Sequence, residues 1–206
     1  GVNFAKGLAA ALDKPLIGID HIRAHLYAPQ IESPLEYPYL GVLLSGGHTV
    51  ICRVDSYDSI EVLGTTIDDA IGEAFDKVAK HYGLGYPGGV MIDRLAQKGN
   101  PKAFLFPGPD LHKGYHPYDL SYSGLKTAVI NQLDMFSTGE EASPENIAAS
   151  FQRVAVGMLI KKVDKALEDT GLKRISAGGG VAANSEIRKK IFWLKTDLTQ
   201  ATWPVL

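Results

Sequence analysis

Glycine-rich turns are the part of this sequence whose residue types most clearly suit chemistry. Gly46-Gly47 lies between two apolar runs, and Gly178-Gly179-Gly180 lies between an apolar run and a segment with helical patterning. A phosphate reaches backbone N–H groups only where side chains do not obstruct it, and a helix N-terminus adds a favourable dipole. One such turn is commonly a plain hairpin, but the additional pair Gly88-Gly89 favours a shared phosphate site. We therefore expect an enzyme that binds a nucleotide.

Histidines form a second group with chemical potential. His21 and His25 are four residues apart, so a helix would place both on one face and within reach of one metal ion. Spacing alone favours ordinary surface or hydrogen-bonded histidines over a metal pair, because two ligands do not complete a site. A Glu does not follow His21 directly, so the zinc-protease helix pattern is absent. His48 ends the first glycine turn, where it either binds a phosphate or carboxylate or braces the turn.

An acidic segment follows the hairpin that carries the first glycine turn. Its apolar residues recur at helical spacing and predict a helix over 66–82, begun by a capping box of Thr66 and Asp69. The acidic side chains on its other face are Asp68, Asp69, Glu73 and Asp76. Spacing alone favours a solvated face, with Asp76 and Lys80 as an ordinary ion pair.

The elements that must position these residues predict an α/β fold. Apolar runs indicate strands at 15–20, 39–44, 49–54, 59–63 and 173–177. Helical patterns occur at 1–12, 21–28, 66–82, 90–98, 124–133 and 144–170, and from about residue 184. Pro29 is expected to end the second helix, and residues 30–38 are the best candidate for an interdomain linker. Five aromatic residues predict that residues 99–124 form an ordered insertion.

Composition narrows the class of protein. At 206 residues with 45% hydrophobic side chains, the chain is long enough to bury a real core. The 21 basic and 23 acidic residues nearly balance, so RNA binding would need a local patch or a partner. A lone cysteine, Cys52, suits a reducing compartment. An apolar stretch of the roughly 20 residues that a membrane span requires is absent, and we expect a cytoplasmic protein without membrane partners.

Six motifs in a fixed order go beyond these generic inferences. They are His21-Ile22-Arg23-Ala24-His25-Leu26, Leu43-Leu44-Ser45-Gly46-Gly47-His48-Thr49, Asp68-Asp69-Ala70-Ile71-Gly72-Glu73-Ala74-Phe75-Asp76-Lys77, Tyr86-Pro87-Gly88-Gly89, Ser121-Tyr122-Ser123-Gly124-Leu125-Lys126-Thr127 and Gly179-Gly180-Val181-Ala182-Ala183-Asn184. Together they resemble the TsaD family, the tRNA N6-adenosine threonylcarbamoyltransferases once called O-sialoglycoprotein endopeptidases. The resemblance covers about residues 1 to 191.

The resemblance implies an actin-like, sugar-kinase and Hsp70-type fold, also described as ASKHA or RNase H-like. Residues 1–34 would be the end of a first lobe that carries the histidine helix. Residues 35–206 would be the second lobe, with a helical insertion around 95–150. The histidine helix and the glycine turns would then face a nucleotide held between two lobes.

The implied reaction transfers a threonylcarbamoyl group from threonylcarbamoyl-adenylate to N6 of adenosine 37 in tRNAs that read ANN codons. The matching substrate-binding positions are Leu43, Leu44, Ser45, Gly46, Gly47, Asp76, Gly89, Asp93 and Asn184. Ser45 to Gly47 would hold the phosphate, while Asp76 and Asn184 contact the ribose or adenine side. One iron or zinc ion would be held by His21 and His25. These implied roles reverse the interpretation from spacing alone for Asp76 and for the histidine pair.

The resemblance also implies partners: tRNA, a TsaB-like paralogue and a TsaE-like ATPase, in a homo- or heterodimer. The family's opening phosphate-turn motif and its late motif with the third metal ligand have no match here. Thr196-Asp197-Leu198 lies too early for the late motif, and residues 193–206 depart from the family pattern, as a foreign or frameshifted tail would. We therefore expect a partial chain that alone binds metal poorly and transfers little.

Three other functions compete with this interpretation. A metallopeptidase would need a water-activating Glu beside His21, and the sequence has Ile22 there. A sugar kinase or ATPase of the same fold would need a catalytic Asp facing the γ-phosphate, and the sequence does not single one out. An inactive or partial paralogue would bind only a nucleotide or partner subunits.

Overall fold

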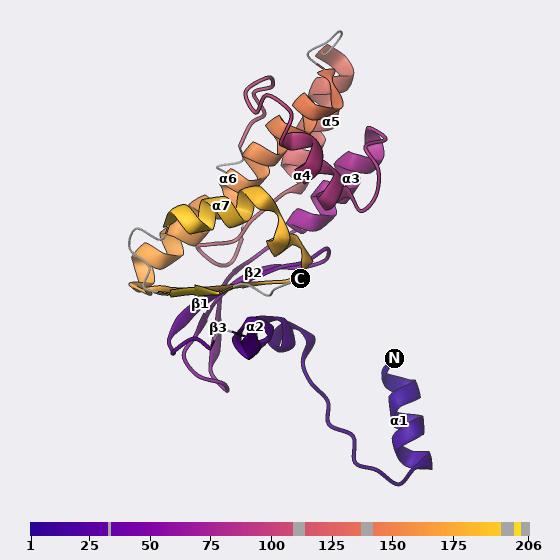
Figure 1. Ribbon diagram of the computed structural model, residues 1–206, viewed down its shortest axis with the longest axis vertical. Coiled ribbons are helices and arrows are strands. Elements are labelled where there is room, and N and C mark those ends of the chain that lie inside the picture. Colours follow the sequence, from indigo (N-terminus) through magenta and orange to yellow (C-terminus); the bar gives the residue numbers. More distant parts are fainter. Residues whose placement is uncertain (33, 109–113, 137–141, 195–199, 203–206) are drawn as a thin grey trace.

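A computed structural model of the chain describes residues 1–32, 34–108, 114–136, 142–194 and 200–202. Its centre is a five-stranded sheet in the order β3-β2-β1-β4-β5 (Figure 1). The strands are β1 (Tyr39–Leu44), β2 (Thr49–Val54), β3 (Ile60–Thr65), β4 (Arg174–Gly178) and β5 (Gln200–Thr202). Strand β2 is antiparallel to both of its neighbours, whereas β4 pairs in parallel with β1 and β5 pairs in parallel with β4.

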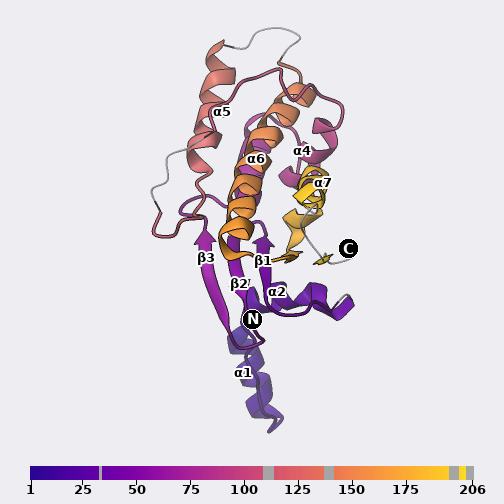
Figure 2. The ribbon, with the colours of Figure 1, turned by 90° about the vertical axis from the view of Figure 1, so that its left-hand side faces the viewer.

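Helices lie on both sides of this sheet, except the first helix, which stands apart from it. They are α1 (Val2–Ala11), α2 (His21–Glu32), α3 (Ile71–His81), α4 (Gly88–Ala96), α5 (Ser123–Phe136), α6 (Pro144–Thr170) and α7 (Ser185–Trp193), with a 3-10 turn at Gly180–Ala183. Helices α3 to α7 lie on one side of the sheet and α2 lies on the other (Figures 1 and 2). Every residue of β1 is buried, because this central strand has packed helices on both of its faces.

Two hydrophobic cores follow from this layering. Leu40, Val42 and Leu44 of β1 face the larger core beneath α3 to α7. Tyr39 and Leu43 alternate with them and face a smaller core under α2. The period-2 alternation of a strand therefore divides one apolar run between the two cores.

Helix α6 confirms the strongest helical pattern in the sequence. Ser143 is its N-cap and accepts a hydrogen bond from the Asn146 amide, and Pro144 occupies the first helical turn. Gly171 closes the helix in the left-handed conformation, at φ 66°. The long α6 packs against α4 and also contacts α7, so both helices are held in place by the same element.

The strand expected at 15–20 is absent. Residues 14–20 have no regular secondary structure, and the side chains of Ile17 and Ile19 are about 80% exposed (82% and 79%). A strand requires a neighbour for its backbone groups, and this segment pairs with none of the described strands. Helix α1 confirms the expected first helix, but it buries no residue and stands away from the sheet in both views (Figures 1 and 2).

Helix α2 does not end at Pro29 as expected; it continues to Glu32. A proline has no N–H, so it leaves the carbonyl of the residue four positions earlier, His25, without its helical donor. That carbonyl lies against Gly178 of β4, where a Cβ atom would sit only 2.6 Å from the oxygen. The carbonyl freed by the proline thus lies where the helix backbone is close to the sheet.

Helix α3 begins at Ile71, five residues later than predicted. The hydroxyl of Thr49 on β2 accepts the Ile71 N–H at 3.0 Å, and Ala70 is the N-cap without a side-chain bond. Thr66 forms an isolated parallel bridge with Leu120 instead of a capping box. A contact from another strand thus replaces the local cap that the sequence pattern predicted.

Strand β4 is not the last strand, because β5 pairs with it in parallel through Arg174 and Gln200. A three-residue strand of sequence Gln-Ala-Thr carries too little apolar pattern to be predicted.

Aromatic anchoring of the insertion is confirmed at Phe104, Phe106, Tyr118 and Tyr122, which are buried, but Tyr115 is fully exposed. Among the described residues, no helix is both long and apolar enough to cross a membrane.

Candidate functional site

The glycine turns meet because β1 and β4 are parallel neighbours. Leu43 pairs with Gly178, so both strands point their carboxyl ends at the same edge of the sheet. Ligands of open α/β sheets bind outside this edge. The turn after β1 and the 3-10 turn after β4 contribute Gly46 and Gly180 to one cavity there. The expectation that the two turns share a site is therefore supported by their positions.

Hydrogen bonds fix the turn between β1 and β2. The Ser45 N–H donates to the His48 carbonyl at 2.8 Å, and the His48 N–H donates to Ser45 Oγ at 3.0 Å. Among the described residues, the amides of Gly46 and Gly47 donate no hydrogen bond. Both glycines are exposed. The turn thus holds two N–H groups available to an anion, as a phosphate cradle requires.

A cavity of about 630 Å³ adjoins this turn, within the range of 300–1,000 Å³ that is usual for small-molecule sites. Five of the predicted substrate-binding residues line it: Gly46, Asp76, Gly89, Asp93 and Asn184. The remaining four do not line it. Leu43 and Leu44 are fully buried in β1, and Ser45 and Gly47 lie in the turn beside the cavity. The substrate roles of all nine residues stay predictions.

Asp76 joins α3 to the start of α4. Its Oδ1 accepts the Gly88 N–H at 2.7 Å, and within the described part of the chain no ion pair joins it to Lys80, as spacing had suggested. A Cβ atom on Gly88 would lie 2.6 Å from Asp76 Cα, so only glycine permits this approach of the two helices. The carboxylate is therefore held at the cavity wall with its second oxygen available.

Asp93 and Asn184 face each other across α4 and α7. Asn184 is the N-cap of α7, and its Oδ1 accepts the N–H groups of Glu186 and Ile187. Asp93 accepts hydrogen bonds from the Ser185 amide at 3.0 Å and the Ser185 hydroxyl at 2.6 Å. Both side chains are thereby tied to the first turn of α7.

The two histidines of α2 lie together as the resemblance implied. The ring centroids of His21 and His25 are 4.6 Å apart, and His48 of the glycine turn lies 6.1 Å from His21. Sequence spacing did not predict the approach of His48, which results from the packing of α2 against the β1 end of the sheet. Partial burial, followed by the charges of His21 and His48, lowers the pKa of His25. The lowered pKa favours the neutral imidazole, the form that binds a metal.

The described residues contain no group of three His, Cys, Asp or Glu side chains placed to hold a metal ion. His21 and His25 fit a divalent ion as two nitrogen ligands, and His48 does not complete the set. Asp197, the residue considered for a third ligand, lies outside the described residues.

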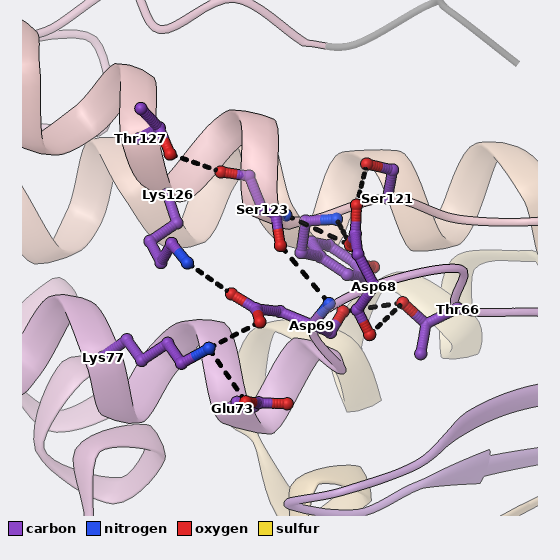
Figure 3. Close-up of polar contacts among 10 residues, drawn as sticks. Thr66, Asp68, Asp69, Glu73, Lys77, Ser121, Ser123, Lys126 and Thr127 are labelled. Carbon is purple, nitrogen blue, oxygen red and sulfur yellow. Dashed lines mark hydrogen bonds and ion pairs between the residues drawn. The ribbon is translucent and has the colours of Figure 1, made fainter. Parts of the chain in front are cut away.

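A second polar cluster joins α3 to α5 (Figure 3). Asp69 accepts hydrogen bonds from Lys77 at 2.6 Å and Lys126 at 2.8 Å, and Lys77 also contacts Glu73 at 2.9 Å. Asp69 is 8% exposed, so the expected solvated acidic face is wrong for this residue. The two lysines come from segments far apart in sequence, and helical spacing therefore gave no signal of the cluster.

Opposing effects act on the Asp69 carboxyl. Burial raises its pKa, but the hydrogen bonds and charges of Lys126 and Lys77 outweigh burial and hold the pKa below its usual value. The neighbouring Asp68 accepts the Tyr122 and Ser123 N–H groups at the start of α5. Both carboxylates therefore serve to fix α5 against α3 and not to line the cavity.

A sheet in this order, with glycine turns above the ends of its neighbouring parallel strands, defines an actin-like α/β protein. Solved structures share the fold. Full-length HypF in its phosphate- and nucleotide-bound form aligns with a TM-score of 0.73 at 15% identity, over 96% of this chain and 41% of that one. The activator of the 2-hydroxyisocaproyl-CoA dehydratase from Clostridium difficile aligns at 0.53 and 16% identity, over 89% and 60%.

The sequence assigns the family within that fold. The model of the tRNA N6-adenosine threonylcarbamoyltransferase family, TsaD, matches residues 1–204, and the chain belongs to this family. The transferase of Treponema denticola is 61% identical over 192 residues, which are 93% of this chain and 57% of the relative. That of Borrelia hermsii is 55% identical over 96% of this chain and 59% of the relative. The chain thus spans less than two thirds of the length of these relatives.

The family match corrects one expectation. It includes residues 193–204, so the expectation that residues 193–206 depart from the family pattern is wrong for most of that segment. The parallel pairing of β5 with β4 agrees with the longer match. The six motifs end at Asn184, and a comparison by short motifs alone therefore missed this segment.

Proposed function

We propose that this chain forms the nucleotide-binding part of a tRNA N6-adenosine threonylcarbamoyltransferase. The reaction moves the threonylcarbamoyl group of threonylcarbamoyl-adenylate to N6 of adenosine 37 in tRNAs that read ANN codons. One observation carries the proposal: Gly46, Asp76, Gly89, Asp93 and Asn184 converge on a single cavity beside the glycine turn. Membership of the TsaD family supplies the reaction class.

In this proposal the two ends of the adenylate meet different groups. The free amides of Gly46 and Gly47 take the phosphate, whose charge they stabilise without reorganisation. Asp76, Asp93 and Asn184 contact the nucleoside. Full-length HypF, which shares the fold, has a phosphate- and nucleotide-bound form, and this supports a nucleotide ligand here.

The transfer itself requires little covalent chemistry from the protein. The adenine N6 amine forms a bond to the carbamoyl carbon, and the bond from that carbon to the phosphate oxygen breaks. AMP leaves with the electron pair, and the amine loses a proton. The acyl group arrives already activated, so the main tasks of the chain are to position the adenylate and to stabilise the leaving phosphate.

His21 and His25 are the residues that would hold the family's iron or zinc ion. Their imidazoles are adjacent, and the lowered pKa of His25 favours its neutral form. A bound divalent ion would supply Lewis acidity toward the carbamoyl or threonyl oxygens. The contact between the rings of His21 and His48 places the histidine pair at the edge of the sheet that also carries the glycine turn.

The proposal includes the partners that the family implies: tRNA, a TsaB-like paralogue and a TsaE-like ATPase, in a homo- or heterodimer. It assigns the reaction to the cytoplasm, where tRNA is modified. The division into the end of a first lobe at 1–34 and a second lobe at 35–206 is also part of the proposal. Helix α2, assigned to the first part, packs against β1 and β4 of the second.

The test is a reconstituted transfer reaction. The chain is combined with unmodified tRNA, threonylcarbamoyl-adenylate and the two partner proteins, and modified adenosine is measured by mass spectrometry. We expect modified adenosine with the wild-type chain, less with Asp76→Asn, and wild-type amounts with Asp164→Asn, an exposed acid on α6. A chain that binds AMP but yields no modified adenosine would contradict the transfer function and leave only a nucleotide-binding role.

A further inference from the structure

Gln152 of α6 lies behind the cavity and contacts two of its predicted binding residues. Its side chain is buried, with 5% of the residue exposed, and a buried amide requires hydrogen-bond partners. Its Oε1 accepts a hydrogen bond from Asn184 Nδ2 at 2.8 Å. Its Nε2 donates to Asp93 Oδ1 at 3.3 Å. One amide thus bridges the side chains that face each other across α4 and α7.

The orientation of this bridge is determined by its neighbours. Two backbone N–H groups at the start of α7 require the Asn184 oxygen, so the Asn184 amide nitrogen must point toward Gln152. Gln152 must therefore present its oxygen to Asn184 and its NH₂ group to the Asp93 carboxylate. Reversing either amide would bring together two donors or two acceptors. The network is satisfied in one arrangement only.

Once the bridge has formed, few hydrogen-bonding groups of Asn184 and Asp93 remain free to bind a ligand. Asn184 retains one N–H, and Asp93 retains lone pairs beyond those used by Ser185 and Gln152. A nucleoside is recognised by hydroxyl and ring-nitrogen groups, for which a fixed donor beside a fixed acceptor is suited. Pre-ordering these groups removes a cost of binding, because they need not be immobilised by the ligand.

Resting on the proposed function, we propose that Gln152 is a positioning residue that orients Asn184 and Asp93 toward the nucleoside of the adenylate. It does not itself line the cavity. It acts through the donor that Asn184 presents and the acceptor that Asp93 presents. The glycine turn, which takes the phosphate, lies outside this network.

The test compares AMP and adenosine binding by calorimetry in the wild-type chain and in Gln152→Met. Methionine is similar in length and apolar, so it removes both hydrogen bonds with little change in volume. We expect both ligands to bind about tenfold more weakly, the loss that corresponds to one well-formed hydrogen bond. The matched control is Ser150→Ala on the same helix, because Ser150 is equally buried and hydrogen-bonded, to Phe104 and Asn100, but lies off the cavity.

A ligand-free measurement accompanies the binding data. Hydrogen exchange at the Glu186 and Ile187 amides reports whether Asn184 still caps α7. We expect faster exchange in Gln152→Met and wild-type exchange in Ser150→Ala. Gln152→Glu keeps an acceptor for Asn184 but places a second carboxylate against Asp93. It should therefore preserve this exchange protection while still weakening AMP binding.

The outcomes separate this inference from the proposed function. A wild-type chain that binds neither AMP nor adenosine would refute the nucleotide site and the inference with it. A wild-type chain that binds both, with Gln152→Met binding them within twofold and with unchanged exchange, would refute the inference alone. A loss confined to AMP would also refute it, because it would place the effect of Gln152 at the phosphate.

Discussion

The cavity proposed to bind the nucleotide and the histidine pair lie at the same edge of one sheet, yet they are built differently. Around the cavity, Asp76, Asp93 and Asn184 are each hydrogen-bonded to another element of the chain. On α2, the ring of His21 contacts the rings of His25 and His48. The first region is preorganised by contacts within the described residues. The second brings two candidate metal ligands together, and the described residues add no third ligand.

This difference predicts that nucleotide binding and metal binding can be separated by mutation. Changes around α3, α4 and α7 should weaken nucleotide binding while zinc binding is retained. Changes on α2 should do the reverse. Four experiments can break or refine this separation, from the largest expected effect to the smallest.

Gly88→Ala is expected to have the largest effect. The new Cβ would lie 2.6 Å from Asp76 Cα and would push α4 away from α3. The shift would misplace Gly89 and Asp93 at the cavity together, so AMP affinity should fall by about 100-fold, the loss that corresponds to two well-formed hydrogen bonds. Calorimetry with AMP measures the effect.

Gly157→Ala on α6 is the control. Its new Cβ meets open space, and the substitution should stabilise the fold by about 0.5–1 kcal/mol. Wild-type AMP affinity in Gly88→Ala would show that the α3–α4 contact does not shape the cavity.

His21→Ala should act on the other region. We expect the wild-type chain to bind zinc weakly, because the described residues supply two ligands, and His21→Ala to weaken that binding at least about tenfold. AMP affinity should stay within twofold. A zinc-indicator competition assay measures the first quantity and calorimetry the second. His81→Ala, an exposed histidine on α3, serves as the control. Stoichiometric zinc or iron in the purified wild-type chain would contradict the expectation of weak binding.

Asp69→Asn tests the cluster that holds α5 on α3. It removes the ion pairs of Asp69 with Lys77 and Lys126, which are partly shielded from solvent. The free energy of unfolding at pH 7 should therefore fall by about 1–2 kcal/mol. The folded-state pKa of Asp69 is lowered, so its stabilisation is present above the ordinary Asp value near 3.9 and is lost as pH falls below it. Urea unfolding at pH 7 and near pH 3 should therefore show a difference that shrinks in acid.

The control for this experiment is Asp164→Asn, an exposed acid, which should stay within about 0.5 kcal/mol of wild type at both pH values. A constant Asp69→Asn difference across the pH range would argue against a charge effect. A large loss of AMP affinity in Asp69→Asn would show that the cluster shapes the cavity after all.

The reactivity of the Cys52 thiol tests the packing of α2 on the sheet and is the last of the four experiments. It lies in the core under α2, and burial raises the pKa of its thiol to about 12. At pH 8 the folded chain should react with iodoacetamide far more slowly than the urea-unfolded chain. Labelling followed by mass spectrometry measures both rates. Folded-state labelling that approaches the unfolded rate would show that α2 opens from the sheet, and AMP should not alter the labelling rate.

Sequence patterns identified elements whose signals are local. The hairpin that carries the glycine turn and the capped helix α6 follow from residues adjacent in the chain. The start of α3 could not be predicted, because its first N–H is satisfied by Thr49 on a strand. The extent of α2 could not be predicted either, because the helix continues through Pro29 where its backbone lies close to Gly178 of the sheet.

The candidate site, too, combines residues that the sequence indicated with contacts that it did not. Family resemblance indicated Asp76, Gly89, Asp93 and Asn184, and the structure gathers all four at one cavity. The burial of Asp69 and the bridge through Gln152 depend on residues from separate helices. Such contacts have no periodicity along the chain, so only a three-dimensional arrangement reveals them.

The parallel pairing of β1 with β4 also bears on how the chain folds. The hairpin of β1 and β2 joins neighbours in sequence, but Leu43 meets Gly178 only after most of the chain has been placed. Closing so long a loop costs entropy before any contact offsets it, and non-local pairings of this kind slow folding. Until β4 arrives, β1 is an edge strand with unpaired backbone groups, and refolding intermediates should be prone to self-association at this edge.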